Sequence, residues 1–120
     1  MRLMVKTDEM IAAIKAAIHH TCRPEIRLSG RGRLAVMANG RPVTAEVAGR
    51  VPIGFEVPDG ADTTSAQVCA QCVLYALGTA RDEVIVTVPY PGGPAYFWTE
   101  GGLYRVPRGW GDDGHCGGWV

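Results

Sequence analysis

The chain has 120 residues, of which 47% are hydrophobic and 20% are charged, which is typical of one globular domain with its own core. Its twelve basic and twelve acidic residues cancel, so the overall charge does not by itself indicate a nucleic-acid-binding protein. No apolar run approaches the roughly 20 residues of a membrane helix, and the opening MRLMVKTDEM lacks the apolar segment of a secretory signal.

The first part of the chain predicts a strand followed by a helix. Residues 1–6 alternate apolar and basic side chains, as a short strand does, and Thr7 is placed to cap the helix that follows. Pro24 ends the helical region because its nitrogen has no hydrogen to donate. Apolar residues recur in the helix at steps of three and four and form one stripe: Met10, Ile11, Ile14, Ala17 and Ile18.

A run of hairpins follows this helix. The turn sequences SGRG and NGRP separate stretches that alternate apolar and polar residues, which predicts antiparallel strands. Two further strands are expected over residues 43–49 and 51–58. In the second of them Ile53, Phe55 and Val57 share one face.

The second part of the chain repeats this order. Thr64 and Gln67 have the spacing of a capping box and are expected to open a second helix that runs to about Leu77. Three strands follow, EVIVTVP, AYFWTE and LYRVP, and the turn TEGG joins the last two. The predicted fold is an α+β domain over residues 1–108, built from duplicated β-α-β-β-β units with two helices packed on one side of an antiparallel sheet. Residues 109–120 are expected to form a glycine-rich C-terminal tail.

The cysteines allow two interpretations. Cys69 and Cys72 have the C-x-x-C spacing of half a zinc site, but on a helix they share the side of Val73, where cysteine packs as a small hydrophobe. A zinc site needs four ligands, and its cysteine candidates are Cys22, Cys69, Cys72 and Cys116. We favour packing in the core, with no metal and no cofactor, and keep a small zinc-binding module as an alternative. Four cysteines without a secretory signal favour thiols over disulfides, and so a cytoplasmic location.

No set of catalytic residues is apparent. A deaminase-type zinc site needs a His or Cys ligand just before a glutamate, and the chain offers only Thr44 ahead of Glu46, in a predicted strand. No P-loop, dinucleotide-binding or serine-nucleophile motif is present. His19 and His20 stand at a helix end, where solvated cations are common. We therefore expect a protein that is not an enzyme.

Several stretches carry a resemblance to a known family. EMIAAIKAAIHH stands where the family has its first helix, GRLAVMANG is similar to its L-x-I-x-A-N strand, and VPIGFEVP to its I-G-F-x-V strand. SAQVCAQCVLYAL takes the place of the second helix, and GLYRVP that of the closing strand. Over residues 1–108 the chain thus resembles one domain of the bacterial DNA polymerase sliding clamp, most closely its C-terminal domain.

The resemblance implies a scaffold. Sliding clamps are closed rings of six such domains, whose helices surround duplex DNA and whose sheets form the outer wall. They tether DNA polymerases and repair proteins, which dock short peptides beside the last strand. A single-domain chain would then form a homo-oligomer, most simply a hexamer, through its edge strands.

The resemblance also implies site residues. The DNA-facing residues would contact phosphates without reading the base sequence, and they are Lys15, His19, Arg23 and Arg81. The pocket for partner peptides would consist of Tyr104, Val106 and Pro107. An alternative function is an interaction or inhibitor protein of the same fold, which binds a protein partner without encircling DNA.

Overall fold

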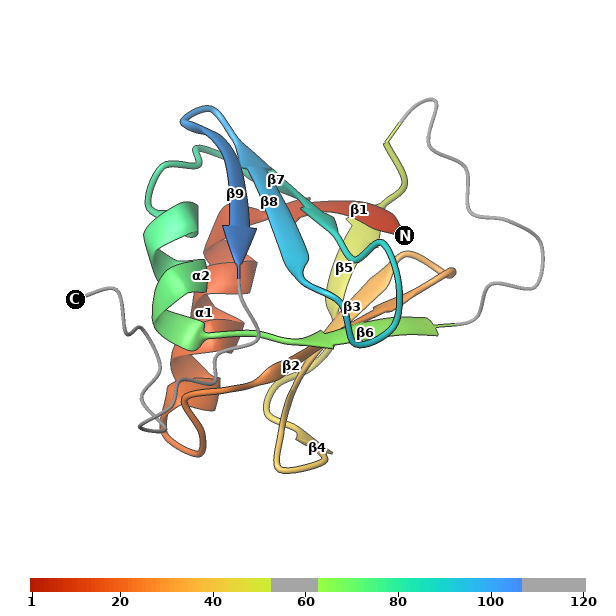
Figure 1. Ribbon diagram of the computed structural model, residues 1–120, viewed down its shortest axis with the longest axis vertical. Helices are drawn as coiled ribbons and strands as arrows, with labels where there is room; N and C mark the ends of the chain where they lie inside the picture. Colours follow the sequence, from red (N-terminus) through yellow and green to blue (C-terminus); the bar gives the residue numbers. More distant parts are fainter. Residues whose placement is uncertain (53–62, 107–120) are drawn as a thin grey trace.

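The computed structural model describes residues 1–52 and 63–106 (Figure 1). Within these ranges the helices and strands form two similar series. The first series consists of β1 (Arg2–Lys6), α1 (Thr7–Ile18), β2 (Glu25–Ser29), β3 (Arg33–Ala38), the two-residue β4 (Arg41–Pro42) and β5 (Val47–Arg50). The second consists of β6 (Thr63–Gln67), α2 (Ala70–Leu77), β7 (Glu83–Thr87), β8 (Ala95–Thr99) and β9 (Gly102–Val106).

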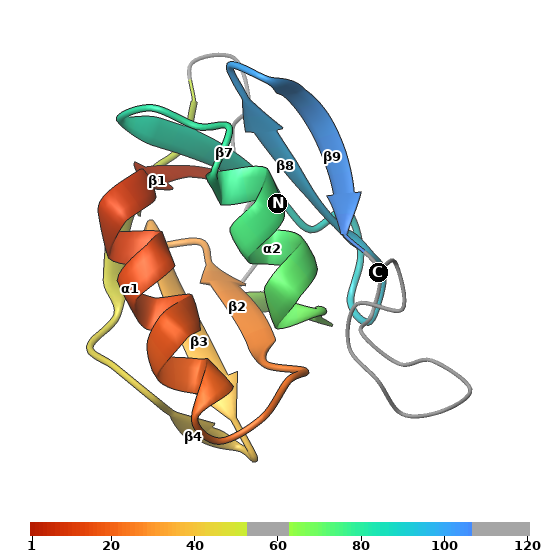
Figure 2. The same cartoon turned by 90° about the vertical axis from the view of Figure 1, so that its left-hand side faces the viewer.

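The strands form one curled antiparallel sheet in the order β6-β2-β3-β5-β1-β7-β8-β9, and β4 pairs with β3. The first strand of each series pairs with the other series, β1 with β7 and β6 with β2. The hairpins β2–β3 and β7–β8 occupy equivalent places, with β5 and β9 beside them. Both helices lie side by side on one face of this sheet (Figure 2). The predicted α+β class, with two helices on one side of antiparallel strands, is confirmed.

Strand β1 is tied to the second series at both of its ends. The amino group of Met1 donates a hydrogen bond to the Val88 carbonyl oxygen at 2.8 Å, and burial, with a smaller effect of Arg2, lowers its pKa. At the other end, the Thr7 backbone N–H donates to the Asp82 carbonyl oxygen at 2.9 Å. These contacts fix the place of β1 beside β7.

The core lies between the helices and the sheet. In the longer strands alternate residues point inward, which places one apolar side of these strands in the core beneath the helices. Around the SGRG turn this alternation buries the residues that the sequence predicts, namely Ile26, Leu28, Leu34 and Val36. The largest fully buried side chains also include Phe97, Leu3, Met10, Ile14 and Leu77.

The start of the second helix differs from the sequence prediction. Residues 63–67 form β6 rather than a first helical turn, and α2 begins at Ala70. Every residue of β6 pairs with β2, and this pairing buries Ala66 in the core. The capping-box spacing of Thr64 and Gln67 is a weak local signal, and the hydrogen bonds of a five-residue ladder outweigh it.

Two details of the first helix are also corrected. Thr7 is the first residue of α1 and does not cap it, because the N-cap is Lys6, which makes no side-chain capping hydrogen bond. The Thr7 hydroxyl is buried and has no hydrogen-bond partner among the described residues. Ile18, the last residue of α1, is 41% exposed although it belongs to the predicted apolar stripe.

Some predicted features lie outside the described residues. They include most of the expected strand 51–58, with its aligned Ile53, Phe55 and Val57, and the tail 109–120. Of the residues in that expected strand, the structure describes only Val51 and Pro52.

Strand β8 provides a test of which face of the sheet is inside. Phe97→Ala should lower the free energy of unfolding by about 3–5 kcal/mol, because Phe97 is fully buried and its truncation leaves a cavity. Trp98→Ala, on the opposite face, should cost less than about 1 kcal/mol because Trp98 is 49% exposed. Urea unfolding followed by circular dichroism measures both losses, and similar values would contradict this assignment.

Candidate functional site

The predicted DNA-facing residues do not form one cluster. Lys15 and His19 are exposed at the end of α1, and Arg23 is half-buried in the loop before β2. Arg81 follows α2, and because the two helices run in opposite directions it lies at the other end of the helix layer (Figure 2). The structure keeps Lys15 and His19 together and separates Arg81 from them.

The helix layer carries few charges. None of the eight residues of α2 is charged, and α1 balances Lys15 against Asp8 and Glu9 in its first turn. Tyr75, on the exposed side of α2, keeps 59% of its surface accessible. Attraction for phosphates on this side would therefore come from the C-terminal end of α1.

Tyr104 and Val106, two of the three predicted partner-peptide residues, face the helix side of β9. The Tyr104 ring packs edge-on against Tyr75 of α2, with ring centroids 6.1 Å apart, and is half-buried. Val106 is 1% exposed and packs in the core. Pro107 lies outside the described residues.

The cysteines divide into two kinds. Cys69 is buried at the N-cap of α2 and Cys72 is half-buried one turn further on, and neither forms a disulfide. Burial of Cys69 in the core is thus confirmed. Cys22 is disulfide-bonded, so the expectation of thiols rather than disulfides is wrong for this residue.

A metal site is not assembled in the described part of the chain. Residues 1–52 and 63–106 contain no group of three or more His, Cys, Asp or Glu side chains that could hold a metal ion. Cys116, the fourth cysteine of the proposed zinc set, lies outside these ranges.

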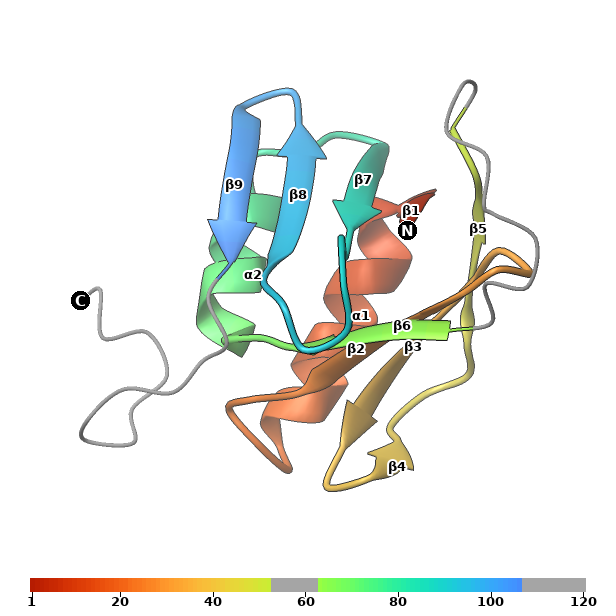
Figure 3. The ribbon, with the colours of Figure 1, turned by 45° about the vertical axis from the view of Figure 1, so that its right-hand side comes forward.

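Figure 3 shows the outer face of β7, β8 and β9, with the helices behind these strands. This face carries a feature that the sequence analysis missed. Trp98 and Leu103 are 49% and 52% exposed, and they lie opposite each other on β8 and β9. The register continues this line through Ile85 of β7, opposite Trp98, to Met4 of β1, opposite Ile85. We call Met4, Ile85, Trp98 and Leu103 the outer apolar row.

Charged residues flank the outer apolar row on both sides. On one side there is a concavity of about 470 Å³. Its lining consists of Met4, Ile85 and Trp98 with the rim residues Arg81, Asp82, Glu83, Thr99 and Glu100. On the other side, the next line of the register consists of Arg2, Thr87, Tyr96 and Arg105. The row therefore separates a mainly acidic rim from a line with an arginine at each end.

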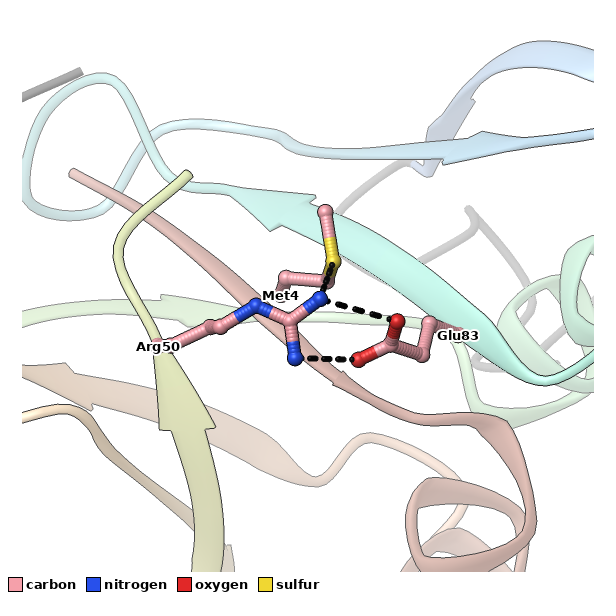
Figure 4. Close-up of polar contacts among 3 residues, drawn as sticks. All are labelled: Met4, Arg50 and Glu83. Atoms are coloured by element: carbon pink, nitrogen blue, oxygen red, sulfur yellow. Dashed lines mark hydrogen bonds and ion pairs between the residues drawn. The ribbon is translucent and has the colours of Figure 1, made fainter. Parts of the chain in front are cut away.

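Arg50 of β5, opposite Met4, closes the row at one end. Its Nη1 and Nη2 lie 2.9 and 3.0 Å from the two carboxylate oxygens of Glu83, and Nη2 also lies 3.1 Å from the Met4 sulfur (Figure 4). The pair is bidentate, but both side chains are partly exposed, so it stabilises the fold by about 1 kcal/mol or less. It neutralises Glu83, which leaves Asp82 and Glu100 as the rim acids with no ion pair among the described residues.

Part of this row was readable from the sequence. Successive side chains of a strand point to opposite faces of the sheet, so Trp98 must point outward if Phe97 points into the core. Met4 could not be assigned to the same row, because its neighbourhood depends on the pairing of β1 with β7.

Comparisons with known protein families, with characterised proteins and with solved structures find no match for this chain. In the described residues, neither helix is long and apolar enough to cross a membrane.

Cys69 and Cys72 should respond differently to substitution. Cys69→Ala should lower the free energy of unfolding by about 1–3 kcal/mol, because its thiol is buried in the core, and half-buried Cys72→Ala should cost less. In the native protein a thiol reagent such as DTNB should modify Cys72 faster than Cys69. Stoichiometric zinc in the purified protein, lost when both residues are replaced, would contradict core packing.

Proposed function

We propose that this chain is a clamp-like scaffold, a non-enzymatic domain that assembles with copies of itself into a ring around duplex DNA. It would tether DNA polymerase or other DNA-processing proteins. The supporting observation is the exchange of first strands between two similar β-α-β-β-β series, with both helices on one face of the sheet. In a ring, the helices become the inner lining and the sheet becomes the outer wall.

Assembly would use the open edge of the sheet. Strand β9 stands at one end of the strand order and, within the described residues, pairs only with β8. At the other end β6 is partly covered, because the Gly92 N–H of the β7–β8 loop donates to the Ser65 carbonyl oxygen at 2.9 Å. An unpaired edge invites a strand from another chain. Head-to-tail contacts that close on themselves give a ring, most simply a hexamer.

DNA would face the helix layer. Lys15 and His19 are exposed there, and repetition around a ring would multiply these few charges. Contacts of this kind neutralise phosphates without reading bases, which suits a protein that slides along the duplex. A neutral overall charge does not oppose this, because the sign of the inner surface decides the attraction.

The mass in solution tests the ring. Light scattering at tens of micromolar protein should give a mass several times that of the 12.8 kDa chain, most simply that of six copies, because the β9 edge should recruit a neighbour. A chain that stays monomeric at this concentration would count decisively against the ring.

The two lysines provide a matched test of DNA binding. Lys6 and Lys15 are the only lysines of the chain and both are exposed, Lys15 on the helix side and Lys6 in β1. The wild type should stay on circular duplex DNA in moderate salt and slide off linear DNA. Lys15→Glu should reduce retention on the circle by roughly tenfold or more, since it reverses one phosphate contact per copy, and Lys6→Glu should change it little. Equal effects of the two variants would contradict a DNA-facing helix layer.

A second candidate is a scaffold of the same fold that binds a protein partner without encircling DNA. The low charge of the helix layer favours it, because α2 has no charged residue and Asp8 and Glu9 oppose Lys15. A monomer that shows no preference for circular DNA would support this candidate over the ring.

A further inference from the structure

We infer that the outer apolar row is a docking surface for an extended peptide segment of a partner protein. This segment carries an apolar side chain between two side chains of opposite charge. The inference goes beyond the scaffold function, because the row lies on the face of the sheet opposite the helices and opposite Tyr104 (Figure 3). It does not depend on the formation of a ring.

The exposure of the row is the first argument. Trp98 and Leu103 keep about half of their surface accessible, side by side and next to the open edge of the sheet. Large aromatic side chains that are neighboured by other apolar residues are typical anchors of protein interfaces. The row therefore offers a partner apolar surface that the described part of this chain does not cover.

The charges beside the row are the second argument. On the concave side, Asp82 and Glu100 form no ion pair among the described residues, although Glu100 Oε1 accepts a hydrogen bond from the Arg81 backbone N–H at 3.1 Å. The cations on this side are Arg81 on the rim and Lys6 of β1, which lies opposite Glu83. On the other side, Arg105 is exposed and likewise forms no ion pair there. Charges of opposite sign are thus available on the two sides of Trp98.

The spacing of these groups fits an extended chain. Neighbouring lines of side chains on one face of a sheet are two residues apart, or roughly 6.6 Å. A peptide lying extended along β8 has its alternate side chains at the same spacing. When an apolar residue of the peptide packs on Trp98 and Leu103, the peptide residue two positions to one side reaches the acidic rim. The peptide residue two positions to the other side reaches Arg105. A basic residue at the first of these peptide positions pairs with the acidic rim, and an acidic residue at the second pairs with Arg105. The basic residue can come before or after the acidic one in the peptide sequence, because the peptide can lie in either direction along β8.

The concavity fits the basic member of this pattern. Met4, Ile85 and Trp98 line its apolar part, on which the stem of an arginine or lysine side chain can pack. The cationic head then reaches the carboxylates of Asp82 and Glu100, and the Trp98 ring adds a cation–π contact.

A second copy of the chain is a poorer occupant. Its own open strand β9 has Arg105 two residues after Leu103 but Gly101 two residues before it. The copy therefore supplies a basic residue without the acidic residue that Arg105 requires.

Selection from a phage-displayed library of random decapeptides tests the proposal. Peptides enriched on the wild-type protein should carry an apolar residue with a basic residue two positions to one side and an acidic residue two positions to the other. Trp98→Ala should weaken binding of an enriched peptide by roughly tenfold or more. The matched control is Tyr90→Ala, which removes a similarly exposed aromatic ring (57%) from the β7–β8 loop and should leave the affinity unchanged.

A charge reversal tests the pattern itself. Arg105→Glu should change the residue selected at one position from acidic to basic, while the apolar position stays the same. Arg41→Glu, at an exposed arginine of the short strand β4, should leave the selected pattern as it is. A purely structural role of Arg105 would not move this specificity.

Three results would overturn the proposal. One is enrichment that does not differ between the wild type and Trp98→Ala, or that lacks the charge pattern. Another is self-association that disappears in Trp98→Ala, which would assign the row to a second copy. The third is binding of oligothymidylate that is lost in the same variant, which would make Trp98 a base-stacking residue.

Discussion

The exchange of first strands between the two series holds the rest of the structure in place. β1 lies between β5 and β7 and joins the two halves of the sheet. The first residue of each helix donates a backbone hydrogen bond to the other series, α1 to the loop before β7 and α2 to the loop before β2. Thr7 donates its backbone N–H to the Asp82 carbonyl oxygen at 2.9 Å, and Ala70 donates to the Cys22 carbonyl oxygen at 3.1 Å. Each helix packs mainly on strands of its own series, α1 on β1 and β3 and α2 on β8 and β9, and the two helices pack on each other.

This exchange also gives the domain two unlike surfaces. The helix side is poor in charge and shows Tyr75, whereas the outer face of β1 and β7–β9 combines an apolar row with charges of both signs. In the scaffold that we propose, the two faces would serve different partners at the same time. A scaffold needs such a division, because a protein that holds one molecule must present another surface to the next.

The outer apolar row follows from the exchange as well. Met4 lies beside Ile85 only because β1 pairs with β7, and Arg50 reaches Glu83 only because β5 lies on the other side of β1. A chain with the same elements but without the pairing of β1 with β7 would keep Ile85, Trp98 and Leu103 in line but would lose Met4 from the row. The row is thus a product of the topology and not of any one segment.

The sequence by itself determined the order of most elements and the inward face of several strands. Alternation around the SGRG turn, the three- and four-residue steps of α1 and the β-branched stretch of β7 are local patterns that tertiary contacts did not override. The tertiary structure alone decided that residues 63–67 form a strand, since that state depends on hydrogen bonds to β2. It also separated Arg81 from Lys15 and brought Met4 to Trp98, because residues distant in sequence become neighbours only through strand pairing and helix direction.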